Sequence, residues 1–195
     1  MRQVLIAGGG GIGSFLVHRI SDYSENNQFS DTGFTVYDDD VVDTGNIKYQ
    51  NFKDEDILDF KVESLAARYG IVGVTERIES PDIFKDFACI VSAVDNKTFR
   101  EMMFRAAETM DFHWIDLRSE GRSIAYYVKH KKNTLDVMLG TLPKEGGEDG
   151  SCQLEYEKNA GIIQNGNKII AEMGAQLLLN WQRNEASKPQ YIDRI

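Results

Sequence analysis

The sequence contains little cysteine and no excess of basic residues. Cys89 and Cys152 are the only cysteines among 195 residues, so the chain lacks the paired framework that stabilises small secreted domains, and we expect a cytoplasmic protein. Its 22 basic residues are outnumbered by 31 acidic ones, which gives a formal charge of -9. Because binding to nucleic acid requires a basic surface, this balance argues against a nucleic acid partner.

Long apolar runs, internal repeats and linker-like segments are also absent. The first apolar stretch, residues 1–7, meets a glycine-rich segment too early to form a signal peptide core or a membrane span. We therefore expect no leader and no membrane association. The length and the 42% hydrophobic content suit one core, so residues 1–195 are expected to form a single domain.

Short apolar runs alternate with longer segments of helical periodicity, which is the pattern of βαβ units. The expected strands cover residues 3–7, 34–37, 71–77, 89–94, 114–117, 123–129 and 135–139. The expected helices cover about 12–23, 54–69, 98–110 and 166–186. The sequence therefore predicts an α/β fold with a Rossmann-like, mostly parallel sheet, helices on both faces and some antiparallel strands in the C-terminal half.

The last expected helix carries a broad apolar stripe. Its members recur at helical spacing: Ile169, Ile170, Met173, Leu177, Leu178 and Trp181. Such a stripe either packs into the core or forms a subunit interface. Both interpretations are open at this point, and the second predicts a homodimer or a complex with a related subunit.

A glycine-rich turn follows the first expected strand. Gly8, Gly10 and Gly13 fit G-x-G-x-x-G, and Gly11 lies within it. Between a strand and a helix, such glycines let backbone N–H groups approach a phosphate, although a tight turn without a ligand has the same pattern. Asp38 ends the second strand, where a carboxylate can accept hydrogen bonds from a ribose. NAD enzymes and ATP enzymes share these features.

Two further segments distinguish these classes. Residues 37–50 read YDDDVVDTGNIKYQ and resemble the D-x-D-x-V-x-x-x-N-x-x-x-Q segment of the ThiF/MoeB/HesA superfamily, to which ubiquitin-activating enzymes belong. Residues 91–96 read VSAVDN, with Arg100 following, and resemble the D-N-x-x-x-R segment of that family. Residues 150–154 together with Asn167 are similar to the compact ThiF-type proteins of PRTRC systems.

The resemblance implies an ATP- and magnesium-dependent adenylyltransferase that activates the C-terminal carboxylate of a ubiquitin-like or sulfur-carrier protein. It assigns the phosphate cradle to the glycines, the ribose contact to Asp38, and a catalytic phosphate contact to Lys61. Asp95 would bind magnesium and act in catalysis. The remaining nucleotide-binding positions that it implies are Asp40, Asn46, Lys48 and Gln50.

The chemistry independently accounts for these residue types. When a carboxylate attacks the α-phosphate of ATP, pyrophosphate leaves and negative charge accumulates on phosphate oxygens. A lysine and a magnesium ion held by a carboxylate stabilise that charge, and no general base is required because the attacking carboxylate is already ionised. The alternatives are that Asp38 and Asp95 are turn or cap residues and that Lys61 is an exposed helix charge.

The resemblance has a notable departure at Tyr49, where the family usually has an arginine. Many members also carry an arginine on a helix before the first strand, which this sequence does not show. Lys48 is adjacent to the substituted position but cannot reproduce the fork of a guanidinium. Two alternatives therefore stay open: a nucleotide-binding scaffold or partner subunit without activity, and an NAD-dependent oxidoreductase.

A partner subunit could instead supply the arginine, as arginine fingers do. The candidate donors are Arg2, Arg19 and Arg122.

The last hypothesis concerns Cys152, which follows a polar, glycine-rich segment and would be exposed, whereas Cys89 lies in an apolar run and should be buried. Cys152 is a candidate nucleophile for a thioester; the alternative is an ordinary loop cysteine, because the acidic residues before it would raise its pKa.

Overall fold

The computed structural model of the chain describes residues 1–129, 138 and 165–195. Its strands are β1 (Arg2–Ala7), β2 (Thr32–Tyr37), β3 (Val72–Val74), β4 (Cys89–Ser92), β5 (His113–Glu120), β6 (Ser123–Lys129) and β7 (Gln190–Arg194). Its helices are α1 (Gly13–Glu25), α2 (Lys61–Tyr69), α3 (Lys97–Thr109) and α6 (Gly166–Gln182), with short 3-10 helices η1 (Asp54–Asp56) and η2 (Pro81–Asp86).

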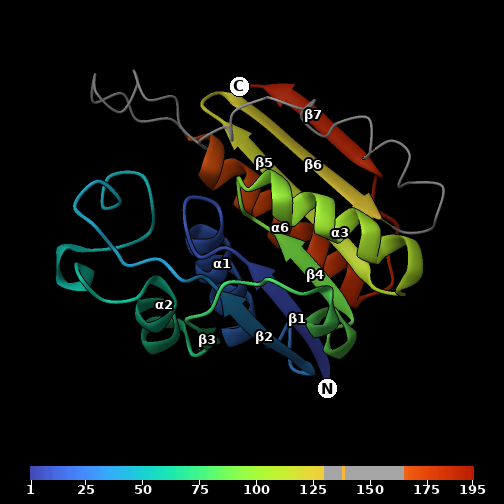
Figure 1. The fold of residues 1–195 in the computed structure, drawn as a ribbon, viewed down its shortest axis with the longest axis horizontal. Coiled ribbons are helices and arrows are strands. Elements are labelled where there is room, and N and C mark those ends of the chain that lie inside the picture. Colours follow the sequence, from blue (N-terminus) through green and yellow to red (C-terminus); the bar gives the residue numbers. More distant parts are fainter. Residues whose placement is uncertain (130–137, 139–164) are drawn as a thin grey trace.

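The strands form one seven-stranded sheet in the order β3-β2-β1-β4-β5-β6-β7 (Figure 1). The pairs from β3 to β5 are parallel. The pairs β5–β6 and β6–β7 are antiparallel. The expected α/β fold, with a mostly parallel sheet and antiparallel strands in the C-terminal half, is confirmed.

Successive residues of β1 face two different cores, as the alternation of side chains in a strand requires. Val4 and Ile6 belong to the core that also contains residues of α1, α2 and α6. Leu5 belongs to the core that contains residues of α3 and η2. Helices therefore cover both faces of the sheet (Figure 1), and β1 is buried on both sides, which is why it reads as an unbroken apolar run.

The apolar stripe of α6 is part of the core. Ile170, Leu177 and Leu178 are buried, and α6 packs against α1, β5 and β6. Ile169, at 36% exposure, is the stripe's most accessible described member. The core-packing interpretation is thus confirmed, and the stripe itself gives no support to a subunit interface. Within the described residues, no helix is long and apolar enough to cross a membrane.

Several element boundaries differ from those expected. Helix α2 begins at Lys61 rather than near residue 54, because the chain leaves helical geometry after η1: Ile57 is extended and Leu58 has a φ of 78°. Strand β3 ends at Val74, three residues before the expected end. Strand β7 was not predicted at all. The strand expected at 135–139 lies outside the described residues, apart from a buried Met138.

Candidate functional site

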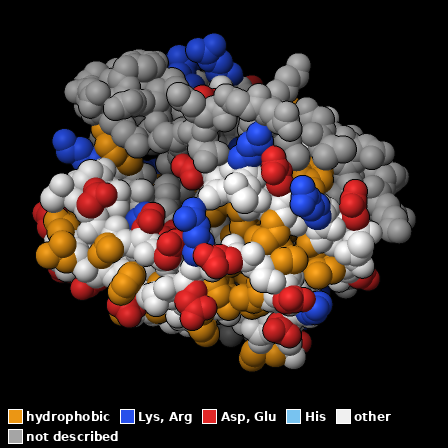
Figure 2. Space-filling model, in the orientation of Figure 1, with side chains coloured by type: hydrophobic (Ala, Val, Ile, Leu, Met, Phe, Trp, Pro, Cys, Tyr) orange, Lys and Arg blue, Asp and Glu red, His pale blue; other side chains and the backbone are white. Residues whose placement is uncertain are grey.

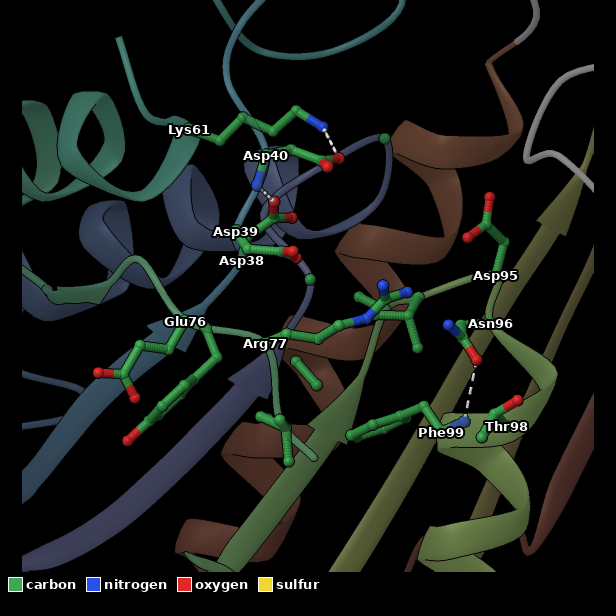
Figure 3. A pocket seen from close by; sticks show the side chains of 18 of the residues that line it. Asp38, Asp39, Asp40, Lys61, Glu76, Arg77, Asp95, Asn96, Thr98 and Phe99 are labelled. Carbon is green, nitrogen blue, oxygen red and sulfur yellow. Dashed lines mark hydrogen bonds and ion pairs between the residues drawn. The ribbon is translucent and has the colours of Figure 1, made fainter. Parts of the chain in front are cut away.

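A cleft of about 710 Å³ lies at the carboxyl ends of the parallel strands (Figure 3). Gly8 follows β1, Asp38 follows β2, Arg77 comes after β3, and the segment 93–96 follows β4; all of them line the cleft. Strand β1 lies between β2 and β4. The connection that follows β1 leads to β2 on one side of it, and the connection that follows β3 leads to β4 on its other side. Open α/β sheets bind their ligands at such a switch point.

The glycine loop is shaped by close backbone contacts. Gly8 has a φ of 97°, and a Cβ at this position would lie 2.9 Å from the Ala93 carbonyl oxygen. A Cβ on Gly13 would lie 1.9 Å from the Gly8 carbonyl oxygen. Gly10 and Gly11 line the cleft, whereas Gly13 does not. The loop therefore uses Gly8 and Gly13 to turn and pack, and Gly10 and Gly11 to present bare backbone to the cleft at the start of α1.

Asp38 organises the glycine loop and faces the cleft. Its Oδ2 accepts a hydrogen bond of 2.7 Å from the Gly9 N–H, and its Oδ1 accepts one of 2.9 Å from the Asp40 N–H. Burial is the largest influence on this carboxyl and raises its pKa above the ordinary value, against the opposing effects of Lys61 and the two backbone donors. Asp38 thus has a structural role in the turn and also lines the cleft.

Lys61 is the first residue of α2 and points at the cleft (Figure 3). Its side chain is only 7% exposed, so the alternative of an exposed helix charge is wrong. The Nζ atom lies 2.6 Å from Oδ2 of Asp40, whose own side chain is 65% exposed. The same Nζ atom is 3.9 Å from the position that a Cβ on Gly10 would occupy. A buried ammonium group therefore lies beside the glycine loop.

Asp95 lies where β4 leads into α3, and its side chain is exposed in the cleft. The neighbouring Asn96 caps α3, because its Oδ1 accepts a 3.0 Å hydrogen bond from the Phe99 N–H. Asp95 is therefore not the cap residue. Arg100 fixes this segment from the helix side: it donates to the Val94 carbonyl and contacts the fully buried Asp116.

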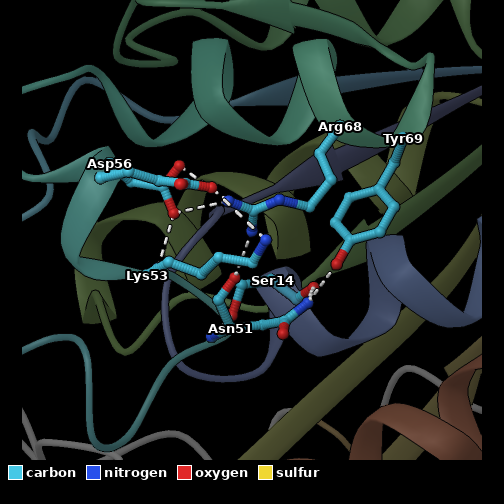
Figure 4. Close-up of polar contacts among 7 residues, drawn as sticks. Ser14, Asn51, Lys53, Asp56, Arg68 and Tyr69 are labelled. Carbon is cyan, nitrogen blue, oxygen red and sulfur yellow. Dashed lines mark hydrogen bonds and ion pairs between the residues drawn. The ribbon is translucent and has the colours of Figure 1, made fainter.

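A second polar network holds the segment that follows Gln50 (Figure 4). The Asn51 N–H donates to Ser14 Oγ at 3.0 Å, and the Asn51 amide nitrogen donates to the Tyr69 hydroxyl at 2.8 Å. Arg68 donates to the Asn51 carbonyl and makes two 2.7 Å hydrogen bonds to Asp56. These contacts join α1, α2 and the segment around residue 51.

The Asp56 carboxyl is stabilised in its charged form. Burial alone would raise its pKa and is the largest single influence, but the hydrogen bonds from Arg68 and the Lys53 N–H, together with their charges, outweigh it. The pKa of Asp56 is therefore lowered. The ion pair with Arg68 is mostly shielded from solvent, so it helps to hold Arg68 in place to donate to the Asn51 carbonyl, next to Gln50.

Two amide oxygens that line the cleft are buried without a hydrogen-bond partner in the described part of the chain. They are Oε1 of Gln50 and Oδ1 of Asn167, and Asn167 is only 4% exposed at the start of α6. Unpaired buried polar atoms are costly, and a ligand with polar groups would satisfy them. Together with the bare glycine backbone, they make the cleft suitable for a nucleotide. The Asp95 carboxylate suits magnesium, which prefers oxygen ligands.

The structure brings most, but not all, of the expected site residues together. Those that line the cleft are Gly8, Gly10, Gly11, Asp38, Asp40, Gln50, Lys61 and Asp95. Asn46 and Lys48 are not among its lining residues, and the Asn46 amide oxygen accepts a hydrogen bond from the Asp43 N–H. Tyr49 lines the cleft. Cys152 lies outside the described residues, while Cys89 is buried on β4 as expected.

Sequence reasoning missed Arg77, which lines the cleft from the loop after β3. The sequence pattern predicted that residues 71–77 form a strand, whereas β3 ends at Val74. The three candidate arginine donors each have partners within the chain: Arg2 hydrogen-bonds Gln182, Arg19 pairs with Glu172, and Arg122 hydrogen-bonds Ile195.

Comparisons with solved structures show the same fold. E. coli MccB with ATP has a TM-score of 0.67 and 15% identity, and the match covers 100% of this chain and 60% of that one. E. coli MccB with AMPCPP and MccA gives 0.66 and 15%, covering 96% and 57%. PaaA gives 0.65 and 15%, covering 100% and 61%. The chain thus spans about three fifths of these proteins.

No curated protein sequence matches the chain. The ThiF family model, in contrast, matches residues 1–193, which is nearly the whole sequence. The glycine loop, Asp38, Lys61 and Asp95 lie together at the switch point of the sheet within that match. The chain belongs to the ThiF family.

Proposed function

We propose that this protein is an ATP- and magnesium-dependent adenylyltransferase that activates the C-terminal carboxylate of a ubiquitin-like or sulfur-carrier protein. The observation that carries the proposal is that the glycine loop, Asp38, Lys61 and Asp95 meet in one cleft. Membership of the ThiF family supports it. So does the fold shared with MccB, which has been solved with ATP and with AMPCPP and MccA.

Each residue has a distinct task in this reaction. Gly10 and Gly11 give backbone N–H groups to phosphate oxygens at the positive end of α1. Asp38 accepts hydrogen bonds from ribose hydroxyls, and Asp95 would hold magnesium, which neutralises phosphate charge. Lys61, buried beside the glycine loop, meets the charge that develops on the α-phosphate.

The reaction is an in-line displacement at phosphorus. An oxygen of the substrate carboxylate forms a bond to the α-phosphorus, the bond between the α-phosphorus and the bridging oxygen breaks, and pyrophosphate leaves with the electron pair. The products are an acyl adenylate and pyrophosphate. Because the carboxylate is already ionised, the protein's contribution is to orient the reactants and to stabilise charge.

The test is isotope exchange between labelled pyrophosphate and ATP, measured with a ubiquitin-like or sulfur-carrier protein as the acyl substrate. Exchange should require the free C-terminal carboxylate and disappear when the same protein carries a C-terminal amide. Exchange that persists with the amidated protein would refute activation of the C-terminus.

A second candidate function is a nucleotide-binding partner subunit without activity. The observation that favours it is Tyr49, which lines the cleft where members of the family usually have an arginine. Nucleotide binding without exchange for any carrier protein, in the isolated chain and in a complex with a related subunit, would support this alternative.

Two further assignments remain predictions. A homodimer or a complex with a related subunit would show in light scattering, and a strictly monomeric mass at high concentration with activity intact would contradict it.

The role of Cys152 as a nucleophile predicts a thiol-sensitive conjugate that Cys152→Ala and Cys152→Ser both abolish. Full turnover in both variants would refute the role.

A further inference from the structure

The charged side chains of the cleft are unevenly divided. Six lining residues are acidic: Asp38, Asp39, Asp40, Glu76, Glu79 and Asp95. Two are basic, Lys61 and Arg77. On the face seen in Figure 2, which is drawn in the orientation of Figure 1, acidic side chains are widespread and basic side chains lie among them. A polyphosphate that enters such a cleft meets repulsion unless nearby cations offset it.

Lys61 can offset this charge only in part. Its Nζ atom lies 2.6 Å from an Asp40 carboxylate oxygen, so its positive charge is shared with an acidic neighbour. Arg77 differs, because within the described residues no hydrogen bond or ion pair engages its guanidinium. In Figure 3 its side chain extends from the loop after β3 across the cleft, toward the segment that holds Asp95 and Asn96.

We propose that Arg77 binds the phosphate groups of the nucleotide and provides the cation that Lys61, paired with Asp40, cannot fully supply. This inference rests on the proposed function, since it takes ATP as the ligand. A guanidinium suits this task because its planar fork of N–H donors matches two phosphate oxygens at once and it stays charged at every working pH. Arg77 is thereby a specificity-determining residue that favours phosphorylated nucleotides over the nucleoside.

The position of Arg77 follows from the short β3. The strand ends at Val74, and residues 76–79 then line the cleft instead of continuing the sheet. Arg77 itself is exposed, so its removal should leave the fold intact. The alternative role of an arginine at this place is to stack on the base, which would affect adenosine and ATP alike.

The test compares Arg77→Ala and Arg77→Lys with wild type in calorimetric titrations of adenosine, AMP and Mg-ATP. Arg105→Ala is the matched control, because Arg105 is an exposed arginine on α3 that does not line the cleft. Arg77→Ala should weaken Mg-ATP binding about 10- to 100-fold, the effect of losing one charge-assisted contact, and leave adenosine binding unchanged. The Mg-ATP affinity of Arg77→Lys should lie between those of wild type and Arg77→Ala, and that of Arg105→Ala should match wild type.

Three results would overturn the inference. If Arg77→Ala weakens adenosine as much as ATP, Arg77 acts on the base or ribose. If it binds ATP like wild type, Arg77 has no part in phosphate binding. If the folded wild-type protein binds no ATP, the proposed function fails and the inference fails with it. If wild type binds ATP but Arg77→Ala binds it equally well, only the inference fails.

Discussion

Two similar substitutions in the glycine loop should damage different properties: Gly13→Ala should lower stability, and Gly10→Ala should lower affinity for Mg-ATP. A Cβ on Gly13 would lie 1.9 Å from the Gly8 carbonyl oxygen, far inside the 3.4–4 Å of an ordinary contact. Backbone atoms on both sides would have to move. Gly13→Ala should therefore lower the free energy of unfolding by about 1–3 kcal/mol or more, the usual cost of overpacking.

Gly10→Ala should spare the fold and damage the site. Its Cβ would have ordinary contacts, with Gln50 Oε1 at 3.8 Å and Lys61 Nζ at 3.9 Å. The methyl group would, however, fill the space where a phosphate approaches the backbone N–H groups. Loss of one charge-assisted hydrogen bond, about 1.5–3 kcal/mol, corresponds to a loss of about 10- to 150-fold in affinity for Mg-ATP.

Urea unfolding and calorimetry with Mg-ATP and adenosine measure both effects. Adenosine binding should be unchanged in Gly10→Ala, because adenosine has no phosphate to displace. The reasoning would be refuted by a Gly10→Ala protein that binds Mg-ATP as tightly as wild type, or by a Gly13→Ala protein of wild-type stability.

Three other predictions concern the groups that hold the site. Because burial raises the pKa of Asp38, affinity for adenosine should decline on acidification at a higher pH than it would with an ordinary carboxyl group. Asp38→Asn should abolish this pH dependence in calorimetry. If adenosine affinity depends on pH in the same way in wild type and in Asp38→Asn, the ribose assignment is contradicted. Asp56→Asn should lower the free energy of urea unfolding by about 1–3 kcal/mol at pH 7. Because the pKa of Asp56 is lowered in the folded protein, the stabilisation by its carboxylate is complete above the pKa of the unfolded state. The difference in unfolding free energy between wild type and Asp56→Asn should therefore begin to narrow only once the pH falls below about 3.9. A difference that does not change with pH would be inconsistent with the ion pair. Arg100→Met should weaken Mg-ATP more than adenosine, because the Val94 carbonyl beside Asp95 loses its donor; equal effects on both ligands in calorimetry would argue against a positioning role.

The parts of the fold that could be predicted are those whose burial leaves a clear pattern. Strand β1 is enclosed on both faces and therefore appears as an apolar run. Strand β7 lies at the edge of the sheet and is mostly exposed, with Ile192 64% accessible. Its residues carry no alternation that would distinguish a strand from a loop, because pairing with β6 rather than burial defines it.

The beginning of α2 shows how a local signal can mislead. The acidic run from Asp54 resembles the first turn of a helix, and that turn does form as η1. The chain then passes through a positive φ at Leu58, and an isolated bridge joins Phe60 to Val41. These tertiary contacts delay the helix to Lys61 and are not visible in the sequence.

The site could be predicted where its residues follow closely on predicted strands. Asp38 and Asp95 come after β2 and β4, whose carboxyl ends meet at one edge of a parallel sheet. Arg77 could not be predicted, because residues 71–77 read as a strand and the structure ends that strand at Val74. Asn167 is brought to the cleft by the start of α6, nearly 160 positions beyond the glycine loop.

The central claim is that the cleft binds ATP with magnesium. The most direct test is calorimetry of the wild-type chain with Mg-ATP, with ATP in excess chelator, and with NAD. We predict saturable binding of Mg-ATP that weakens when magnesium is removed or when Asp95 is changed to Ala, and much weaker binding of NAD. Binding of NAD that equals or exceeds that of ATP, or ATP affinity that is indifferent to both magnesium and Asp95→Ala, would contradict the claim.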